Sequence, residues 1–192
     1  MKITVSETPS SVHHLRRNLT WWVCVLPAGM ILALAAHSPF WLDFVHVMAG
    51  VLWTGTDIFM GFILGPVLRH LEPEQRRAAI NWLTPKTMLY VPVLALTTGT
   101  AGWFLAQWQN MLALDNPARP WVFLAIVDIC LLSVQGFGIL LPNSIRTYVE
   151  LRKTVPDTAK IFRLNRRNNR LAGLQGILQV IIILIMVHLV MG

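Results

Sequence analysis

Five long apolar runs limit how this chain can fold more than any other feature of the sequence. They cover residues 20–37, 43–67, 88–108, 120–141 and 171–191. A helix needs about 20 residues to cross the hydrocarbon core of a bilayer, and each run is close to that length. Backbone groups inside a bilayer must bond within the chain, which a helix achieves. We therefore predict an all-α polytopic membrane protein with five transmembrane helices.

The composition agrees with a membrane location. Hydrophobic residues make up 55% of the 192 residues, and charged residues only 13%. A small soluble domain could not hide so much apolar surface. The formal net charge of +7 would favour nucleic acid in a soluble chain. Here the basic residues follow a topological pattern instead, and we expect no nucleic-acid partner.

That pattern is an alternation between the two sides of the predicted spans. Every lysine and arginine except Arg119 falls on one side, within residues 2–17, 69–86 and 146–170. The positive-inside rule makes this side cytoplasmic. We therefore predict a cytoplasmic N-terminus, an extracytoplasmic C-terminus and a location in the bacterial inner (plasma) membrane.

The spans divide the chain into a few simple parts. Residues 1–19 are predicted to form a cytoplasmic N-terminal segment, and residues 20–192 a transmembrane helical domain. Within this domain, residues 142–170 are predicted to form a basic cytoplasmic loop. This segment is expected either to extend a helix near anionic lipid headgroups or to bind a soluble partner.

The second run carries polar side chains that a lipid-facing helix would not have. At 100° per residue, His46, Gly50, Trp53 and Asp57 share one side of this helix. A carboxylate deep in a span cannot be left facing lipid, so this side is expected to face the protein interior. Asp57 then either carries protons or forms a hydrogen bond to a threonine within residues 97–100 and only fixes the packing.

The fourth run repeats this arrangement. Trp121, Asp128 and Gln135 are seven residues apart and lie on one side of a helix. No lysine or arginine within a span is available to neutralise Asp57 or Asp128. The low dielectric of the interior therefore favours the protonated, neutral carboxyl. We predict Asp57 and Asp128 as proton carriers and catalytic groups.

Histidines are the best candidates for cofactor ligands. His37, His46 and His188 all fall at the outer ends of their predicted helices. Imidazoles at one depth on different helices can jointly bind haem iron or another metal ion. We predict His46 and His188 as metal ligands, and His37 and Trp53 as further cofactor-binding residues.

The choice of the second ligand depends on how the last helix is turned. His188 lies opposite Gln179 on that helix. If the glutamine faces inward, His188 faces lipid or a partner subunit, and Met186 or His37 is the better second ligand.

The stretch from His46 to Arg69 resembles a known motif. It reads HVMAGVLWTG, then an apolar run, GP and a basic residue. This is similar to the leading transmembrane motif of CopD-like copper-resistance domains, HemJ-type protoporphyrinogen oxidases and the membrane domain of cytochrome-c-linked urate oxidases. In these proteins a histidine is followed seven residues later by tryptophan and then by a small residue, here His46, Trp53 and Gly55. The LALTTG of the third run also resembles their next span.

The resemblance implies a four-helix bundle core, to which the first predicted helix is an addition. It also implies a bound haem b with His46 as a ligand. Our leading expectation is a b-type haem-binding membrane subunit in electron transfer, linked to a quinone or to a separate redox protein. Such a subunit would be a membrane oxidoreductase or part of one. The alternatives are a copper or other cation transport or resistance protein and a structural anchor of a larger complex.

Overall fold

The computed structural model describes residues 21–191. The predicted N-terminal segment, residues 1–19, therefore lies outside the described residues. Between residues 21 and 191 the chain forms helices and no strand, so the all-α prediction is confirmed for this range.

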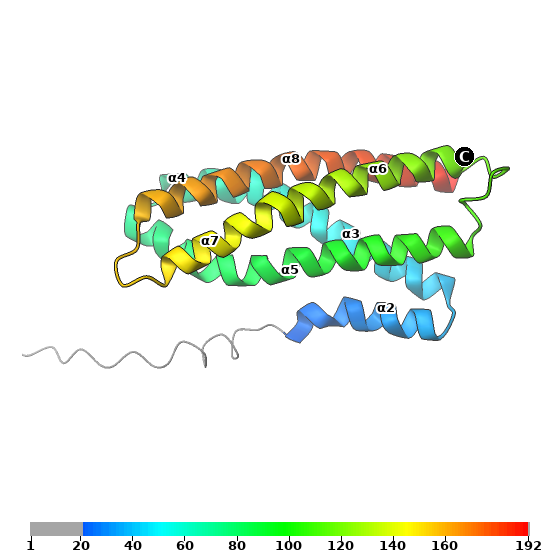
Figure 1. Cartoon of the computed structure of the whole chain (residues 1–192), viewed down its shortest axis with the longest axis horizontal. Coiled ribbons are helices and arrows are strands. Elements are labelled where there is room, and N and C mark those ends of the chain that lie inside the picture. Colours follow the sequence, from blue (N-terminus) through cyan, green and yellow to red (C-terminus); the bar gives the residue numbers. More distant parts are fainter. Residues whose placement is uncertain (1–20, 192) are drawn as a thin grey trace, which may run out of the picture.

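The first helix is short. A 3₁₀ helix, η1 (Trp21–Cys24), leads directly into α2 (Val25–Ala35). Together they are shorter than the roughly 20 residues that a crossing helix needs. Figure 1 shows α2 beside only one half of the longer helices. The predicted crossing by residues 20–37 therefore remains a prediction, as does the count of five.

Four helical stretches are long and apolar enough to cross a membrane. They consist of α3 (Pro39–Ile58), the π-helical η2 (Phe59–Leu64) and α4 (Gly65–His70); of α5 (Pro73–Trp108); of α6 (Arg119–Gln135), the π-helical η3 (Gly136–Leu140) and α7 (Leu141–Leu151); and of α8 (Thr158–Met191). The predicted spans 43–67, 88–108, 120–141 and 171–191 all fall within these stretches. This result supports an integral membrane protein.

Proline begins many of these helical segments. The first turns of α3, α4, α5, α6 and α7 contain Pro39, Pro66, Pro73, Pro120 and Pro142. In α3, α5 and α6 proline suits this place because the first turn of a helix leaves its backbone N–H groups without a helical partner. The helices α4 and α7 instead continue directly from the π-helical segments η2 and η3. Pro85 and Pro92 lie inside α5, which nevertheless continues through both.

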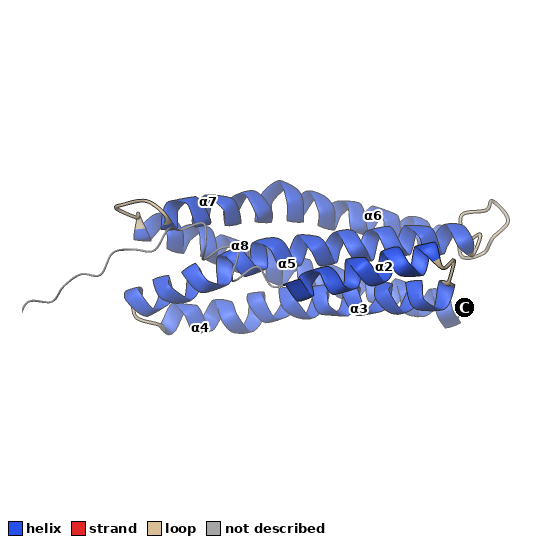
Figure 2. Ribbon diagram, turned by 90° about the horizontal axis from the view of Figure 1, so that it is seen from below, coloured by secondary structure: helices blue, strands red, loops and turns tan. Residues whose placement is uncertain are grey.

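The long helices lie side by side, and their connections alternate between two ends (Figures 1 and 2). The turns between α4 and α5 and between α7 and α8 lie at one end. The α2–α3 and α5–α6 connections and the C-terminus lie at the other. The first end carries the basic residues of segments 69–77 and 146–170, so we call it the basic end, whereas Arg119 begins α6 at the opposite end. That the basic end faces the cytoplasm remains a prediction.

Helices extend beyond the predicted spans at the basic end. The segment 142–170 is not mainly a loop, because α7 continues to Leu151, α8 begins at Thr158 and only residues 152–157 are non-helical. With 36 residues, α5 is about 54 Å long, well beyond the roughly 30 Å of a hydrocarbon core. For residues 142–170, the expectation of a helical extension is therefore the better description.

The interior contains many polar side chains beside apolar clusters, and the outer surface is apolar. Phe123, Val134 and Leu184 are 63%, 69% and 63% exposed, as contact with lipid tails requires. The buried polar side chains are Thr54, Asp57, Thr84, Thr97, Asp128, Asn143, Thr147, Glu150, Asn169, Gln175 and Gln179. Polar residues inside a span are costly and commonly mark a functional site.

Small residues bring α8 close to the end of α3. A Cβ on Gly61 would collide with the backbone of Gly173. A Cβ on Gly176 would lie 2.7 Å from Cγ1 of Ile58. Glycine at these positions permits the close approach of two backbones, as in many membrane helix pairs. The close approach sets Asp57 beside α8.

Candidate functional site

Asp57 lies in the interior between α3 and α8. It is 2% exposed, and its Oδ2 accepts a hydrogen bond of 3.1 Å from Nε2 of Gln179. The prediction that this side of the second run faces inward is confirmed. The expectation of a threonine partner within residues 97–100 is wrong, because the carboxylate is bonded to Gln179 and Thr97 donates instead to the carbonyl of Val93.

A cavity of about 80 Å³ lies next to Asp57. All four long stretches contribute to its wall. Its polar lining includes Asp57, Ser133, Ser144, Asn168, Asn169 and Gln175. The remaining wall is apolar, with Val91 and Pro92 of α5 and Leu132 of α6 among its residues. The cavity therefore combines a carboxylate, hydroxyls and amides within an apolar shell.

Several buried polar atoms on this wall have no hydrogen-bond partner in the protein. They are Nε1 of Trp53, both amide atoms of Gln175, and Oδ1 of Asn168 and of Asn169. Trp53, Gln175 and Asn169 are 3%, 0% and 4% exposed. Buried polar groups are costly when unbonded, so these atoms are available to a polar occupant of the cavity.

Both π-helical segments border the cavity. Met60 of η2 lines one side, and Gly136, Phe137 and Leu140 of η3 line another. Short π-helical segments interrupt the regular bonding of an α-helix and occur frequently at functional sites. Two of them at one cavity distinguish this region from the rest of the described chain.

His46 lies where α3 packs on α5. Its Nδ1 is 2.9 Å from the carbonyl oxygen of Thr98, which can only accept, so Nδ1 carries the proton. The ring fits against Gly102, where a Cβ would lie 2.7 Å from Cε1. Nε2 then keeps its lone pair. A histidine held in this way by a backbone carbonyl is the usual form of a haem or metal ligand.

The other two predicted histidine ligands have different neighbours. The ring of His37 is 5.7 Å from the ring of Trp108, and the ring of His188 is 4.0 Å from that of Trp121. Both side chains are exposed. Gln179 is buried, so His188 faces away from the interior, as the spacing on that helix indicates. Among residues 21–191 there is no group of three or more histidine, cysteine or acidic side chains able to hold a metal ion.

Asp128 is separate from this cavity. It is 9% exposed on α6, and its Oδ2 has no hydrogen-bond partner in the protein. Gln135, seven residues later, donates from Nε2 to the carbonyl of Leu171 at 2.7 Å. Trp121, the third member of the predicted polar side, is 36% exposed.

The amide side chains of α8 were not predicted as site residues. Asn168, Gln175 and Gln179 are separated by seven and four residues and therefore lie on one side of the helix. This spacing is the sequence signal that could have identified them.

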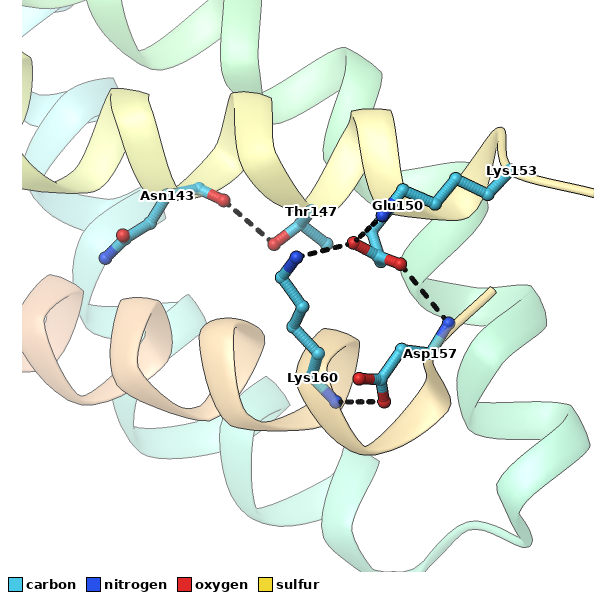
Figure 3. Close-up of polar contacts among 6 residues, drawn as sticks. All are labelled: Asn143, Thr147, Glu150, Lys153, Asp157 and Lys160. Carbon is cyan, nitrogen blue, oxygen red and sulfur yellow. Dashed lines mark hydrogen bonds and ion pairs between the residues drawn. The ribbon is translucent and has the colours of Figure 1, made fainter. Parts of the chain in front are cut away.

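A second polar cluster lies at the basic end (Figure 3). Glu150 lies beyond the predicted span 120–141, is buried, and accepts bonds of 2.7 Å from Lys160 and 2.9 Å from Lys153. It also accepts a bond of 3.3 Å from the backbone N–H of Asp157. Lys160 first and then Lys153 lower the pKa of Glu150 from 4.5 to about 2. Glu150 is therefore ionised near neutral pH, where it links α7 to α8 as an ion-pair clasp and does not carry protons.

Comparisons of the chain with protein-family models, with curated proteins and with solved structures found no match. The resemblance of residues 46–69 to the CopD-like and HemJ-like group therefore remains a prediction.

Proposed function

We propose that this chain is an integral membrane subunit for proton-coupled electron transfer, in which His46 is a ligand of haem b and Asp57 carries protons. A bundle of four crossing helices would hold both groups on the inward side of α3. The observation that carries the proposal is the hydrogen bond of 2.9 Å from Nδ1 of His46 to the carbonyl of Thr98.

Two contacts of His46 support its proposed role as a ligand. The Thr98 carbonyl selects the tautomer with a free Nε2 lone pair and increases the basicity of the ring. Gly102 leaves room for the ring against α5. A bound haem would supply one-electron chemistry, while the chain holds and orients it.

Asp57 supports the coupling to protons. It is buried, its partner Gln179 is neutral, and the spans contain no lysine or arginine to fix its charge. A carboxyl in such a place gains or loses a proton when the charge nearby changes. A quinone or a separate redox protein would be the electron partner.

A reduced-minus-oxidised absorbance spectrum of the purified protein tests this function. We expect a haem spectrum in the wild type and its loss in His46→Ala, with membrane insertion unchanged, because His46 is the only one of the three predicted histidine ligands, all among the described residues, whose ring is bonded to a backbone carbonyl. His37→Ala and His188→Ala are the matched controls and should keep the spectrum.

An unchanged haem spectrum in His46→Ala would make His46 a packing residue. A wild-type protein that contains copper and no haem would favour the alternative of copper or cation transport. A protein that contains neither would favour a structural anchor subunit.

A further inference from the structure

We propose that the four long helices enclose a one-sided water passage that leads from the basic end to Asp57. Its role in delivering protons rests on the proposed function. Its existence rests on the cavities alone and can be tested without any redox group.

The passage consists of two adjacent cavities. The second cavity, of about 30 Å³, shares five wall residues with the first: Met60, Thr87, Ser144, Asn168 and Asn169. The two cavities are therefore neighbours, with these five residues on the wall of both. In the proposed passage, fast rotamer changes of these side chains join the two cavities.

The second cavity continues the polar wall toward the basic end. Thr84 of α5, Thr147 of α7 and Asn165 of α8 line it. Asn165 is near the start of α8, and Thr147 lies one turn before the Glu150 clasp. Asp57 lines only the first cavity. The polar wall thus runs from Asp57 to the helix ends that carry the basic residues.

The unpartnered atoms on the wall favour water as the occupant. Trp53 Nε1 and Gln175 Nε2 are donors, whereas Gln175 Oε1 and the Oδ1 atoms of Asn168 and Asn169 are acceptors. Water satisfies both kinds, while a bare cation would satisfy only the acceptors. The larger cavity, of about 80 Å³, is well above the roughly 10–15 Å³ that is needed to hold a water molecule.

The side of Asp57 that faces away from the basic end is closed by apolar packing. Trp53 packs there with Ala49, Leu94 and Leu132 in one cluster of buried residues. A second apolar cluster follows toward the opposite end: Ala33, Leu42, Ala101 and Leu105. These two clusters therefore close the path between Asp57 and the opposite end. The basic end holds one apolar cluster, in which Leu68 of the second cavity's wall packs with Ile80 and Ile161.

Proton uptake through this passage transfers one proton from the solution to Asp57. A proton leaves the solution at the basic end, moves along water and wall groups, and forms an O–H bond on the Asp57 carboxylate. Release follows the same steps in reverse. Glu150 takes no part because its two lysine partners keep it ionised.

Thiol accessibility tests the passage directly. Cys24 and Cys130 are both exposed and would first be replaced by serine. Single cysteines are then placed at Ser144, which lines both cavities, and at Ser133, which lines only the first. Val134→Cys is the matched control, because Val134 is 69% exposed on the outer, apolar surface. The probe is Ag⁺, a small thiol-reactive ion that travels in water and not in hydrocarbon.

We expect Ser144→Cys and Ser133→Cys to react about tenfold faster or more than Val134→Cys, because charged ions avoid the lipid phase. In sealed vesicles, Ag⁺ added at the basic end should react about tenfold faster than Ag⁺ added at the opposite end. Equal rates at the three positions would exclude the passage. Equal or reversed rates from the two sides would exclude its one-sidedness.

A second variant tests whether the path to Ser133 passes Gln175. Gln175→Met keeps the length of the side chain and removes its polar atoms. It should slow the reaction at Ser133→Cys and leave that at Ser144→Cys unchanged, because Gln175 lines only the first cavity. No slowing at Ser133→Cys would show that the path does not pass Gln175. None of these rates depends on haem, so loss of the haem proposal would leave them unchanged.

Discussion

Asp57 shows how a single hydrogen bond can make a carboxyl acceptable inside an apolar span. Its Oδ2 accepts from the Gln179 amide, which is itself only 1% exposed. Each group therefore needs the other, because a buried polar group without a partner costs about 1–3 kcal/mol. The pair has a structural effect whatever its role in proton transfer.

Two substitutions at Asp57 test the structural effect of its hydrogen bond with Gln179. Asp57→Asn keeps an oxygen that accepts from Gln179 and should lower the free energy of unfolding by less than about 1 kcal/mol. Asp57→Leu leaves the Gln179 amide without an acceptor and should lower it by about 1–3 kcal/mol. Denaturant unfolding followed by circular dichroism would measure both. Asp128→Asn is the control because Asp128 Oδ2 has no protein partner to lose. Equal losses for the two Asp57 variants would contradict this interpretation.

The sequence identifies the titratable residues of the site better than it identifies their partners. Asp57 and His46 stand out because a carboxylate and an imidazole are rare within apolar runs. Their partners, Gln179 and the Thr98 carbonyl, come from other helices, 122 and 52 residues away in the chain. Only the rotation and contact of whole helices fix such pairs, and periodicity within one helix does not contain that information.

At the scale of elements, the close contact of η2 with α8 determines where Asp57 lies. Gly61→Ala should lower the free energy of unfolding by about 1–3 kcal/mol, because its new Cβ meets the Gly173 backbone, which cannot move without separating the helices.

Gly55→Ala is the matched control. No atom lies within 4 Å of the position that its new methyl group would occupy, and alanine favours helix more than glycine does. It should therefore leave stability unchanged or raise it slightly. The same denaturant unfolding measures both variants, and a Gly61→Ala protein as stable as Gly55→Ala would show that the two helices can move apart freely.

The Glu150 clasp predicts a pH-dependent contribution to stability. Its folded-state pKa of about 2 is below the ordinary value of 4.5, so the contribution is complete above about pH 4.5 and is lost as the pH falls toward 2. Glu150→Gln should therefore melt below the wild type at pH 6, and the difference should shrink in acid. Thermal melts at several pH values measure this difference, with Glu74→Gln on the exposed first turn of α5 as control. A difference that is constant with pH would rule out the ionised clasp.

The sequence predicts the membrane part of each element and not its full length. Hydropathy detects the residues that lipid surrounds, and the four runs within the long helices follow from it. It does not detect the extension of α7, because the buried side of this helix is polar and contains Asn143, Thr147 and Glu150. The apolar side of this helix, with Ile145 and Val149, faces outward, so its amphipathic pattern does not indicate which side is buried.

At the scale of the whole molecule, an apolar outer surface surrounds an interior that contains both polar side chains and apolar clusters. Lipid covers the outer surface without cost, so the interior can hold amides and carboxyls if they bond to one another or to water. The polar wall between Asp57 and the basic end follows from this arrangement, and so do the apolar clusters on the other side of Asp57. Between Asp57 and the opposite end the interior is apolar, whereas toward the basic end polar wall groups lie beside one apolar cluster, Leu68, Ile80 and Ile161.

The central claim is that an electron-transfer site at His46 is coupled to proton exchange at Asp57. A redox titration of the haem absorbance at several pH values tests it most directly, in the wild type and in Asp57→Asn. We predict a wild-type midpoint potential that falls as the pH rises, by up to about 59 mV per pH unit for one proton per electron. Asp57→Asn should keep the absorbance and lose most of this dependence. A wild type without haem absorbance, or the same pH dependence in both proteins, would contradict the claim.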